Sequence, residues 1–94
     1  MDNLEELAEI FAKETDKRVI RKLFEELLTK AELEDLCKRW YLMKELYKGK
    51  PQRKIASEME ISLCKITRGS KILKQDNSEF LRILRELFDD QYHV

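Results

Sequence analysis

Apolar residues in the first half of the chain recur every three or four positions, which is the spacing of one face of an α-helix. This pattern predicts one helix over residues 2–14, a second over 18–28 and a long third over 30–49. The apolar face of the third helix is the longest of the three. It comprises Leu33, Leu36, Cys37, Trp40, Met43 and Leu46, with Tyr47 beside the last of them.

Polar residues and Gly49 mark the ends of these helices. Asp2 or Asn3 can cap the first helix, because their side-chain oxygens accept hydrogen bonds from free backbone N–H groups. Thr29 precedes the third helix, and Glu32 three residues later completes the pattern of a capping box. Gly49 can end that helix, since glycine adopts the left-handed conformation without a steric penalty.

The second half of the chain predicts three further helices and no strand. Pro51 suits the first turn of the fourth helix, because the fixed φ of proline is helical and its missing N–H group is not needed there. Asn77 or Ser78 can cap the sixth. These helices are expected at residues 51–59, 63–74 and 79–94.

Composition agrees with an all-α fold of six helices in a single domain. The 94 residues include only two Gly and one Pro, which leaves little material for hairpins, and 40% are charged. Four of the helices carry more large apolar side chains than a small monomer easily buries, and Trp40 belongs to this surface rather than to a ligand site. We therefore expect a homodimer that shares the surface; a self-contained core is the alternative.

The net charge of zero conceals three unlike segments. Residues 1–47 hold twelve Asp or Glu and nine Lys or Arg, residues 48–74 hold two and eight, and residues 75–94 hold five and two. The segment charges are therefore −3, +6 and −3. A basic block of this kind is the electrostatic footprint expected for a phosphate-bearing partner.

The basic segment also has the steric pattern of a helix-turn-helix, a unit in which two short helices cross at a fixed angle. Ala56 offers the small side chain needed at the crossing, and Gly69 lets the second helix approach its neighbours closely. Glu60 stands in the turn where glycine is common, and a left-handed Glu is mildly strained. The apolar positions that would lock the angle are Ile55, Met59, Ile61 and Ile66.

The outward residues of this unit are candidate DNA contacts. Leu63 and Cys64, at the start of the second helix, can contact a thymine methyl group, and Arg53 can reach a guanine edge or a phosphate. A solvated basic face on an ordinary helical hairpin is the alternative. The candidate DNA-contacting residues are Gln52, Arg53, Lys54, Leu63, Cys64, Thr67, Lys71 and Lys74.

Other functional classes find little support in the chain. Cys37 and Cys64 form no CxxC pair and His93 is the single histidine, so we expect free thiols in a reducing compartment and no metal site. There is no glycine-rich phosphate loop and no nucleophile beside a base, so we expect no enzymatic activity. Because no apolar run reaches about 18 residues and no signal peptide opens the chain, we expect a cytoplasmic protein without membrane contact.

The order of several short motifs resembles the tryptophan repressor family of bacteria. The motifs are QRKIA, ITRGS and a following LK, with LLT and ELYKG upstream and Arg39 ten residues after Thr29. The resemblance extends from about Leu23 to Lys74. It implies an intertwined homodimer in which residues 1–48 and 75–94 form the dimer core and residues 49–74 form a helix-turn-helix DNA-reading head.

In that family L-tryptophan is a corepressor that binds between the core and the head. The resemblance implies that Arg68 pairs with the carboxylate of the amino acid and that Arg39 lies over the indole ring; guanidinium groups suit both contacts. Thr29 of the partner subunit would help to hold the ligand. Gly69 would make room for it, and backbone carbonyls near Leu28 would receive its ammonium group.

Several of these residues also have simpler interpretations. Arg39 can pair with Glu32 or Asp35 on its own helix. Thr29 can act only as a helix cap. Arg68 can bind a phosphate instead of a carboxylate.

The leading hypothesis is a sequence-specific transcriptional repressor of tryptophan metabolism genes, with L-tryptophan as corepressor and no other cofactor. Two positions differ from the best-known members of the family: Ile72 stands where a small residue lies near the amino group, and Lys65 replaces a small polar residue. The alternative is therefore a DNA-binding relative that needs no ligand or responds to another small molecule. A purely helical interaction module is a further alternative.

Overall fold

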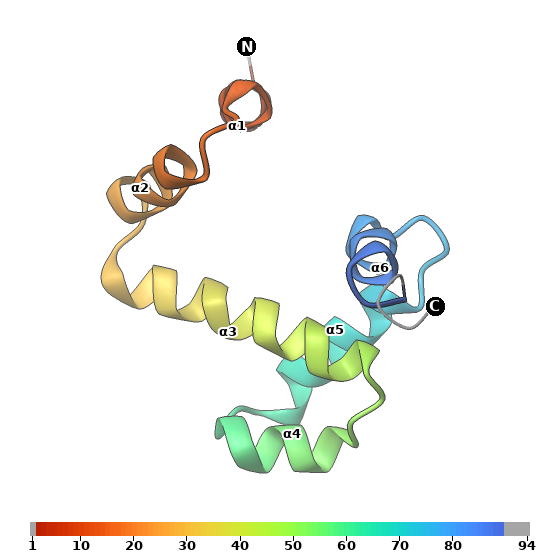
Figure 1. The fold of residues 1–94 in the computed structure, drawn as a ribbon. Helices are drawn as coiled ribbons and strands as arrows, with labels where there is room; N and C mark the ends of the chain where they lie inside the picture. The colour runs from red at the N-terminus through yellow and green to blue at the C-terminus, as the bar shows by residue number, and fades with distance from the viewer. Residues whose placement is uncertain (1, 90–94) are drawn as a thin grey trace. The chain divides into compact units, whose positions relative to one another are not determined.

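A computed structural model describes residues 2–89, and their regular structure is helical throughout. No strand occurs among these residues, so the expected all-α fold with six helices is confirmed. The elements are α1 (Asn3–Lys13), α2 (Lys17–Leu27), α3 (Lys30–Tyr47), α4 (Gln52–Met59), α5 (Leu63–Leu73) and α6 (Glu79–Leu84), followed by a π-helical turn, η1 (Arg85–Asp89) (Figure 1).

Side chains cap the N-terminal ends of most of the helices. The Asp2 carboxylate accepts from the Leu4 N–H group at 2.9 Å. The capping box is formed in both directions, because the Thr29 N–H group donates to Glu32 Oε1 at 2.8 Å and the Glu32 N–H group donates to Thr29 Oγ1 at 3.1 Å. The bond from the Thr29 N–H group, and next to it the Thr29 side chain, hold the pKa of the Glu32 carboxyl below its usual range, since they stabilise the charged form.

Two expectations about helix ends need correction. Pro51 lies at the N-cap of α4 rather than in its first turn, because its extended ψ of 136° keeps it outside the helix. The last helix does not remain α-helical, since its α-helical part ends at Leu84 and η1 continues it. Residues 90–94 of that helix, and His93 with them, lie outside the described residues.

The chain divides after Leu36 into two compact units. The first unit contains α1, α2 and the first part of α3, and no residue of α1 or α2 is buried. Within it, the rings of Phe11 and Phe24 pack with their centroids 5.0 Å apart. The apolar faces of this unit nevertheless remain partly exposed. Their exposed members include Leu4, Leu7, Ile10, Val19 and Leu27.

The second unit has a small core in which three helices meet. Leu42 from α3, Ile55 from α4 and Ile66 from α5 form the buried cluster, and the last two are 1% and 0% exposed. The residues predicted to lock the helix-turn-helix angle all belong to this cluster or pack on it. Met59 and Ile61 of that set pack on it, together with Leu46 and Ala56.

Aromatic contacts hold the C-terminal elements against α3. The rings of Trp40 and Phe80 are 6.2 Å apart, which agrees with the interpretation of Trp40 as a packing residue. At the end of α3, the Tyr47 ring lies 6.3 Å from Phe88 and its hydroxyl donates to Asp89 Oδ1. That hydrogen bond raises the pKa of the Tyr47 phenol. Phe88 and Asp89 both belong to η1, so the residues that contact Tyr47 are part of the π-helical turn.

The described part of the chain contains no helix long and apolar enough to cross a membrane. Over the same residues 2–89, no group of three or more His, Cys, Asp or Glu side chains is arranged to bind a metal ion.

Replacing Ile66 with alanine should lower the free energy of unfolding by about 2–5 kcal/mol, because a fully buried side chain would leave a cavity. The control is Leu63→Ala on the same helix, where the side chain is 51% exposed. That change should stay within about 0.5 kcal/mol. Denaturant unfolding followed by circular dichroism, at one protein concentration, measures both; equal losses would contradict the core assignment.

Candidate functional site

The turn between α4 and α5 fixes how the two helices of the basic segment are joined. Glu60 adopts the left-handed conformation, with φ 54° and ψ 42°, as its position in the turn predicts. The N–H groups of Glu60 and Ile61 both donate to the Ala56 carbonyl oxygen, which closes the end of α4. Ser62 then caps α5, since its hydroxyl accepts from the Lys65 N–H group. A three-residue turn thus connects two helices that share a buried core.

One face of α5 is buried and another is open to solvent. Ile66 and Gly69 are buried against the rest of the unit. Leu63, Thr67 and Lys71 follow one another at four-residue spacing, so they share a face of the helix, and all three are exposed. Lys74 continues this stripe and Cys64 lies beside its start; both are also exposed. The candidate DNA contacts of α5 therefore occupy one accessible surface.

The basic side chains of α4 and α5 form no ion pair with another described residue. Seven ion pairs form among residues 2–89. None of these pairs includes a Lys or Arg residue of α4 or α5, or Lys74 at the end of α5. All of these unpaired Lys and Arg side chains are exposed. Their positive charge is thus free to meet an external anion. We call this set the free basic face, and its members are Arg53, Lys54, Lys65, Arg68, Lys71 and Lys74.

Gln52 is also exposed and begins α4 beside Arg53. All eight candidate DNA contacts are therefore accessible, and none lies in the core of the unit. Their contact with DNA stays a prediction.

Gly69 allows α5 to lie close to α3. A Cβ atom at this position would be 3.1 Å from Leu46 Cδ1 and 3.2 Å from Met43 Sδ. Real side chains rarely sit this close, so the expected close approach of α5 to its neighbours is confirmed. The neighbour is α3 of the same chain. The further role of Gly69 in making room for a ligand stays a prediction.

Two candidate ligand residues of the second unit have unpaired guanidinium groups. Arg39 lies one turn before Leu42 and Met43, on the face of α3 that meets Gly69. It forms no ion pair with another described residue, so the alternative pairing with Glu32 or Asp35 is not observed. Arg68 directly precedes Gly69 and is exposed. Arg39 and Arg68 thus lie close, along their own helices, to residues that make the α3–α5 contact.

Arg68 shares its face of α5 with the two residues that depart from the family pattern. Lys65 lies three positions before it and Ile72 four positions after it, and such residues are neighbours on a helix. Lys65 is exposed and Ile72 is half-buried. The environment of Arg68 is therefore more positive, and more crowded toward Ile72, than small residues would make it.

The remaining candidate ligand residues belong to the first unit. Thr29 forms the capping box already described, and its hydroxyl oxygen accepts a hydrogen bond there. Leu28 ends α2, with its N–H group donating to the Phe24 carbonyl at 3.0 Å. Both residues serve as helix ends, which is compatible with a ligand contact, and that contact stays a prediction.

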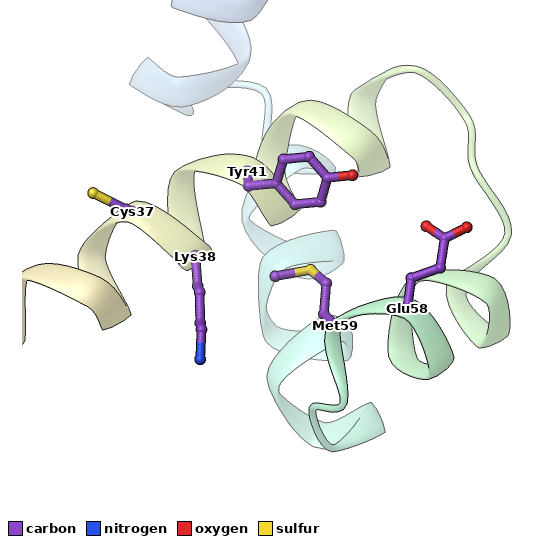
Figure 2. A pocket seen from close by; sticks show the side chains of 5 residues that line it. All are labelled: Cys37, Lys38, Tyr41, Glu58 and Met59. Atoms are coloured by element: carbon purple, nitrogen blue, oxygen red, sulfur yellow. The ribbon is translucent and has the colours of Figure 1, made fainter. Parts of the chain in front are cut away.

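The second unit also has an open pocket of about 370 Å³ between α3 and α4, which the sequence did not predict. In it, Tyr41 and Met59 lie across from each other and Glu58 lies at one edge (Figure 2). The spacing of residues along two separate helices gives no signal for such a pocket. Its lining contains none of the candidate ligand residues. It is formed by Cys37, Lys38, Tyr41, Glu58 and Met59.

The sequence is similar to those of a family of regulatory proteins. Residues 2–88 match the model of the family described as Trp repressor protein. The Trp operon repressor homolog of Xylella fastidiosa strain M23 is 36% identical over 80 residues, which cover 83% of this chain and 87% of the relative. That of Chlamydia trachomatis serovar L2 strain 434/Bu is 31% identical over 71 residues, or 74% and 76% of the two chains. No solved structure matches significantly.

Placing a valine at Gly69 should destabilise the second unit by about 1–3 kcal/mol, because the added atoms would overlap α3 side chains. The control is Lys71→Val, which puts the same residue at an exposed position of the same helix. Chemical denaturation of both variants measures the difference. A Gly69→Val protein as stable as the control would contradict the close α3–α5 contact.

Proposed function

The chain belongs to the Trp repressor protein family, a family of DNA-binding regulators rather than enzymes, and we propose that it is a sequence-specific, homodimeric repressor whose operator binding is enhanced by L-tryptophan. The observation that carries this proposal is the free basic face on α4 and α5. Phosphate contacts supply much of the affinity of a protein for DNA, and they require cations that are not already paired. Five such cations are exposed on the two helices that the family resemblance assigns to DNA binding, and Lys74 at the end of α5 is a sixth; of these, Arg68 is the one that the corepressor would occupy.

The start of α5 provides the residues that would read bases. Leu63 is 51% exposed, and Cys64 and Thr67 are also accessible. The Thr67 hydroxyl donates to the Leu63 carbonyl at 2.8 Å, so its proton is already used. Thr67 would therefore meet DNA with its methyl group or as a hydrogen-bond acceptor, which suits a thymine methyl or the amino group of cytosine.

The unpartnered apolar faces of the first unit support the homodimer. Leu4 is 72% exposed and Ile10 is 51% exposed, although both lie on the apolar face of α1. Contiguous apolar surface of this kind indicates a protein interface, and a second copy of the chain offers a self-complementary one. Two reading heads related by a two-fold axis would enter successive major grooves, about 34 Å apart, on a pseudo-palindromic operator.

Arg39 and Arg68 support the binding of an amino acid with an aromatic side chain. One guanidinium can pair with a carboxylate while the other stacks on an indole ring. The ligand would raise DNA affinity only by preferring the arrangement of the heads that binds DNA. Lys65 and Ile72 favour the second candidate, a relative that needs no ligand or uses another small molecule, because they change the charge and space beside Arg68.

The DNA proposal predicts that the protein enriches a particular duplex from a randomised library, and that the duplex contains two half-sites related by two-fold symmetry. Arg53→Ala should weaken binding to that duplex by roughly tenfold or more, because a contact to a guanine edge or phosphate is lost. The control is Lys17→Ala, which removes an exposed cation from α2. If no sequence is enriched, or if the control loses as much affinity, the proposal fails.

The corepressor proposal predicts heat on titration with L-tryptophan, tighter DNA binding in its presence, and slower amide exchange in α4 and α5. Arg68→Gln should abolish the heat, because the carboxylate contact is lost. Lys74→Gln removes a cation from the exposed stripe of the same segment and should leave ligand binding intact. The absence of heat at millimolar L-tryptophan, with unchanged DNA affinity, would reject the corepressor and leave the ligand-independent relative.

A further inference from the structure

Lys50 is fixed to the end of α3 by the backbone. Gly49 is in the left-handed region with φ 87°, and its N–H group donates to the Leu46 carbonyl at 3.1 Å. The Lys50 N–H group donates to the Glu45 carbonyl at 3.2 Å. This pair of bonds is the Schellman arrangement that ends many helices, and it holds Lys50 in place relative to the last turn of α3.

The side chain of Lys50 joins α3 to α4. Its Nζ atom is 3.5 Å from Glu45 Oε2 on α3 and 2.5 Å from Glu58 Oε2 on α4. The Lys50 and Glu45 side chains are only 22% and 15% exposed, so this ion pair is partly shielded from water. The bond to Glu58 raises the pKa of Lys50, and the same bond lowers the pKa of Glu58. Both groups therefore remain charged at neutral pH.

The position of this bridge makes it important for the helix-turn-helix. Glu58 lies in the last turn of α4, two residues before the left-handed Glu60 that leads into α5. Near Glu58 the packing between α3 and α4 is interrupted by the open pocket that Tyr41 and Met59 also line (Figure 2). The buried contact between Leu42 and Ile55 holds the middle of α4, and the bridge restrains its end.

We infer that Lys50 is a positioning residue for the DNA-binding unit, because it holds the last turn of α4, and so the start of α5, at a fixed place relative to α3. The inference rests on the proposed function for its effect on DNA. Lys50 acts through Glu58 and needs no contact with DNA. Through Lys50, the end of α3 supports α4, and α4 in turn leads into α5.

The Glu58→Gln variant distinguishes an effect of net charge on DNA affinity from an effect of helix positioning, because the two predict changes in opposite directions. Removing a negative charge beside the free basic face should strengthen DNA binding if only net charge matters. If the bridge positions the head, the same change should weaken binding to the duplex enriched by the wild-type protein, by at least roughly fivefold. Glu60→Gln is the matched control, since this exposed carboxylate lies two residues away and forms no ion pair among the described residues.

The first arm of the experiment measures affinity for the enriched duplex and for a mixed-sequence duplex. Glu58→Gln should lose affinity for the enriched duplex only, whereas Glu60→Gln should retain it. Lys50→Met should lose as much affinity for the enriched duplex as Glu58→Gln does. The double variant should bind that duplex no more weakly than either single variant, because both changes break the same bridge. Lys50→Arg keeps the positive charge and should bind like the wild type. Wild-type affinity for the enriched duplex in Glu58→Gln would overturn the positioning role.

The second arm measures amide hydrogen exchange without DNA, so that it does not depend on the proposed function. Amides in the last turn of α4 should exchange at least roughly fivefold faster in Glu58→Gln than in the wild type, while those around Leu42 remain protected. Equal exchange in the two proteins would overturn the bridge itself. If the wild-type protein enriches no duplex, the proposed function fails, and exchange still decides whether Lys50 restrains α4.

Discussion

The contact of Leu42, Ile55 and Ile66 is the interaction on which the second unit depends. Each residue comes from a different helix, so their burial fixes α3, α4 and α5 relative to one another. Gly69 contributes by bringing α5 within van der Waals distance of α3, where any side chain would intrude. Because this core is small, its geometry is supported at the edges by polar interactions, such as the Lys50 bridge and the bond from Tyr47 to Asp89.

The distribution of charge follows from this arrangement. Basic residues that support the fold are paired, as Lys50 is with Glu45 and Glu58, whereas those on the outer faces of α4 and α5 have no partner among residues 2–89. The cation that joins α3 to α4 is thus paired, and the cations on α4 and α5 are available to an anion. An overall charge of zero is compatible with a strongly positive surface because the compensating carboxylates are mostly in other segments.

Local signals explain what could be predicted from the sequence. The number and order of the helices, the capping box of Thr29 and Glu32, and the left-handed Gly49 and Glu60 depend on residues within a few positions of one another, and these are confirmed. The core positions of the helix-turn-helix were predictable because the spacing of a compact two-helix unit is strict. The apolar faces of the first unit were also predictable from the spacing of their residues. The partner predicted to cover them is a second copy of the chain.

Features that depend on distant residues could not be predicted in this way. The bridge from Lys50 to Glu58 depends on how α4 is placed after the turn, and the π-helical turn coincides with contacts from Tyr47. The open pocket between α3 and α4 combines side chains from two helices with no common spacing. The proposed L-tryptophan site is the limiting case, since its predicted residues lie far apart in the sequence and one of them belongs to a partner subunit.

The salt dependence of binding to duplex DNA tests the central claim, that the free basic face contacts phosphate. Each neutralised phosphate releases counterions, so a protein with six or more such contacts should lose roughly a thousandfold or more in affinity between about 50 and 200 mM salt. Replacing Lys71 with alanine should reduce the steepness of log affinity against log salt by about two, because the proposed homodimer would lose one phosphate contact in each subunit. An affinity that does not change with salt would contradict the account.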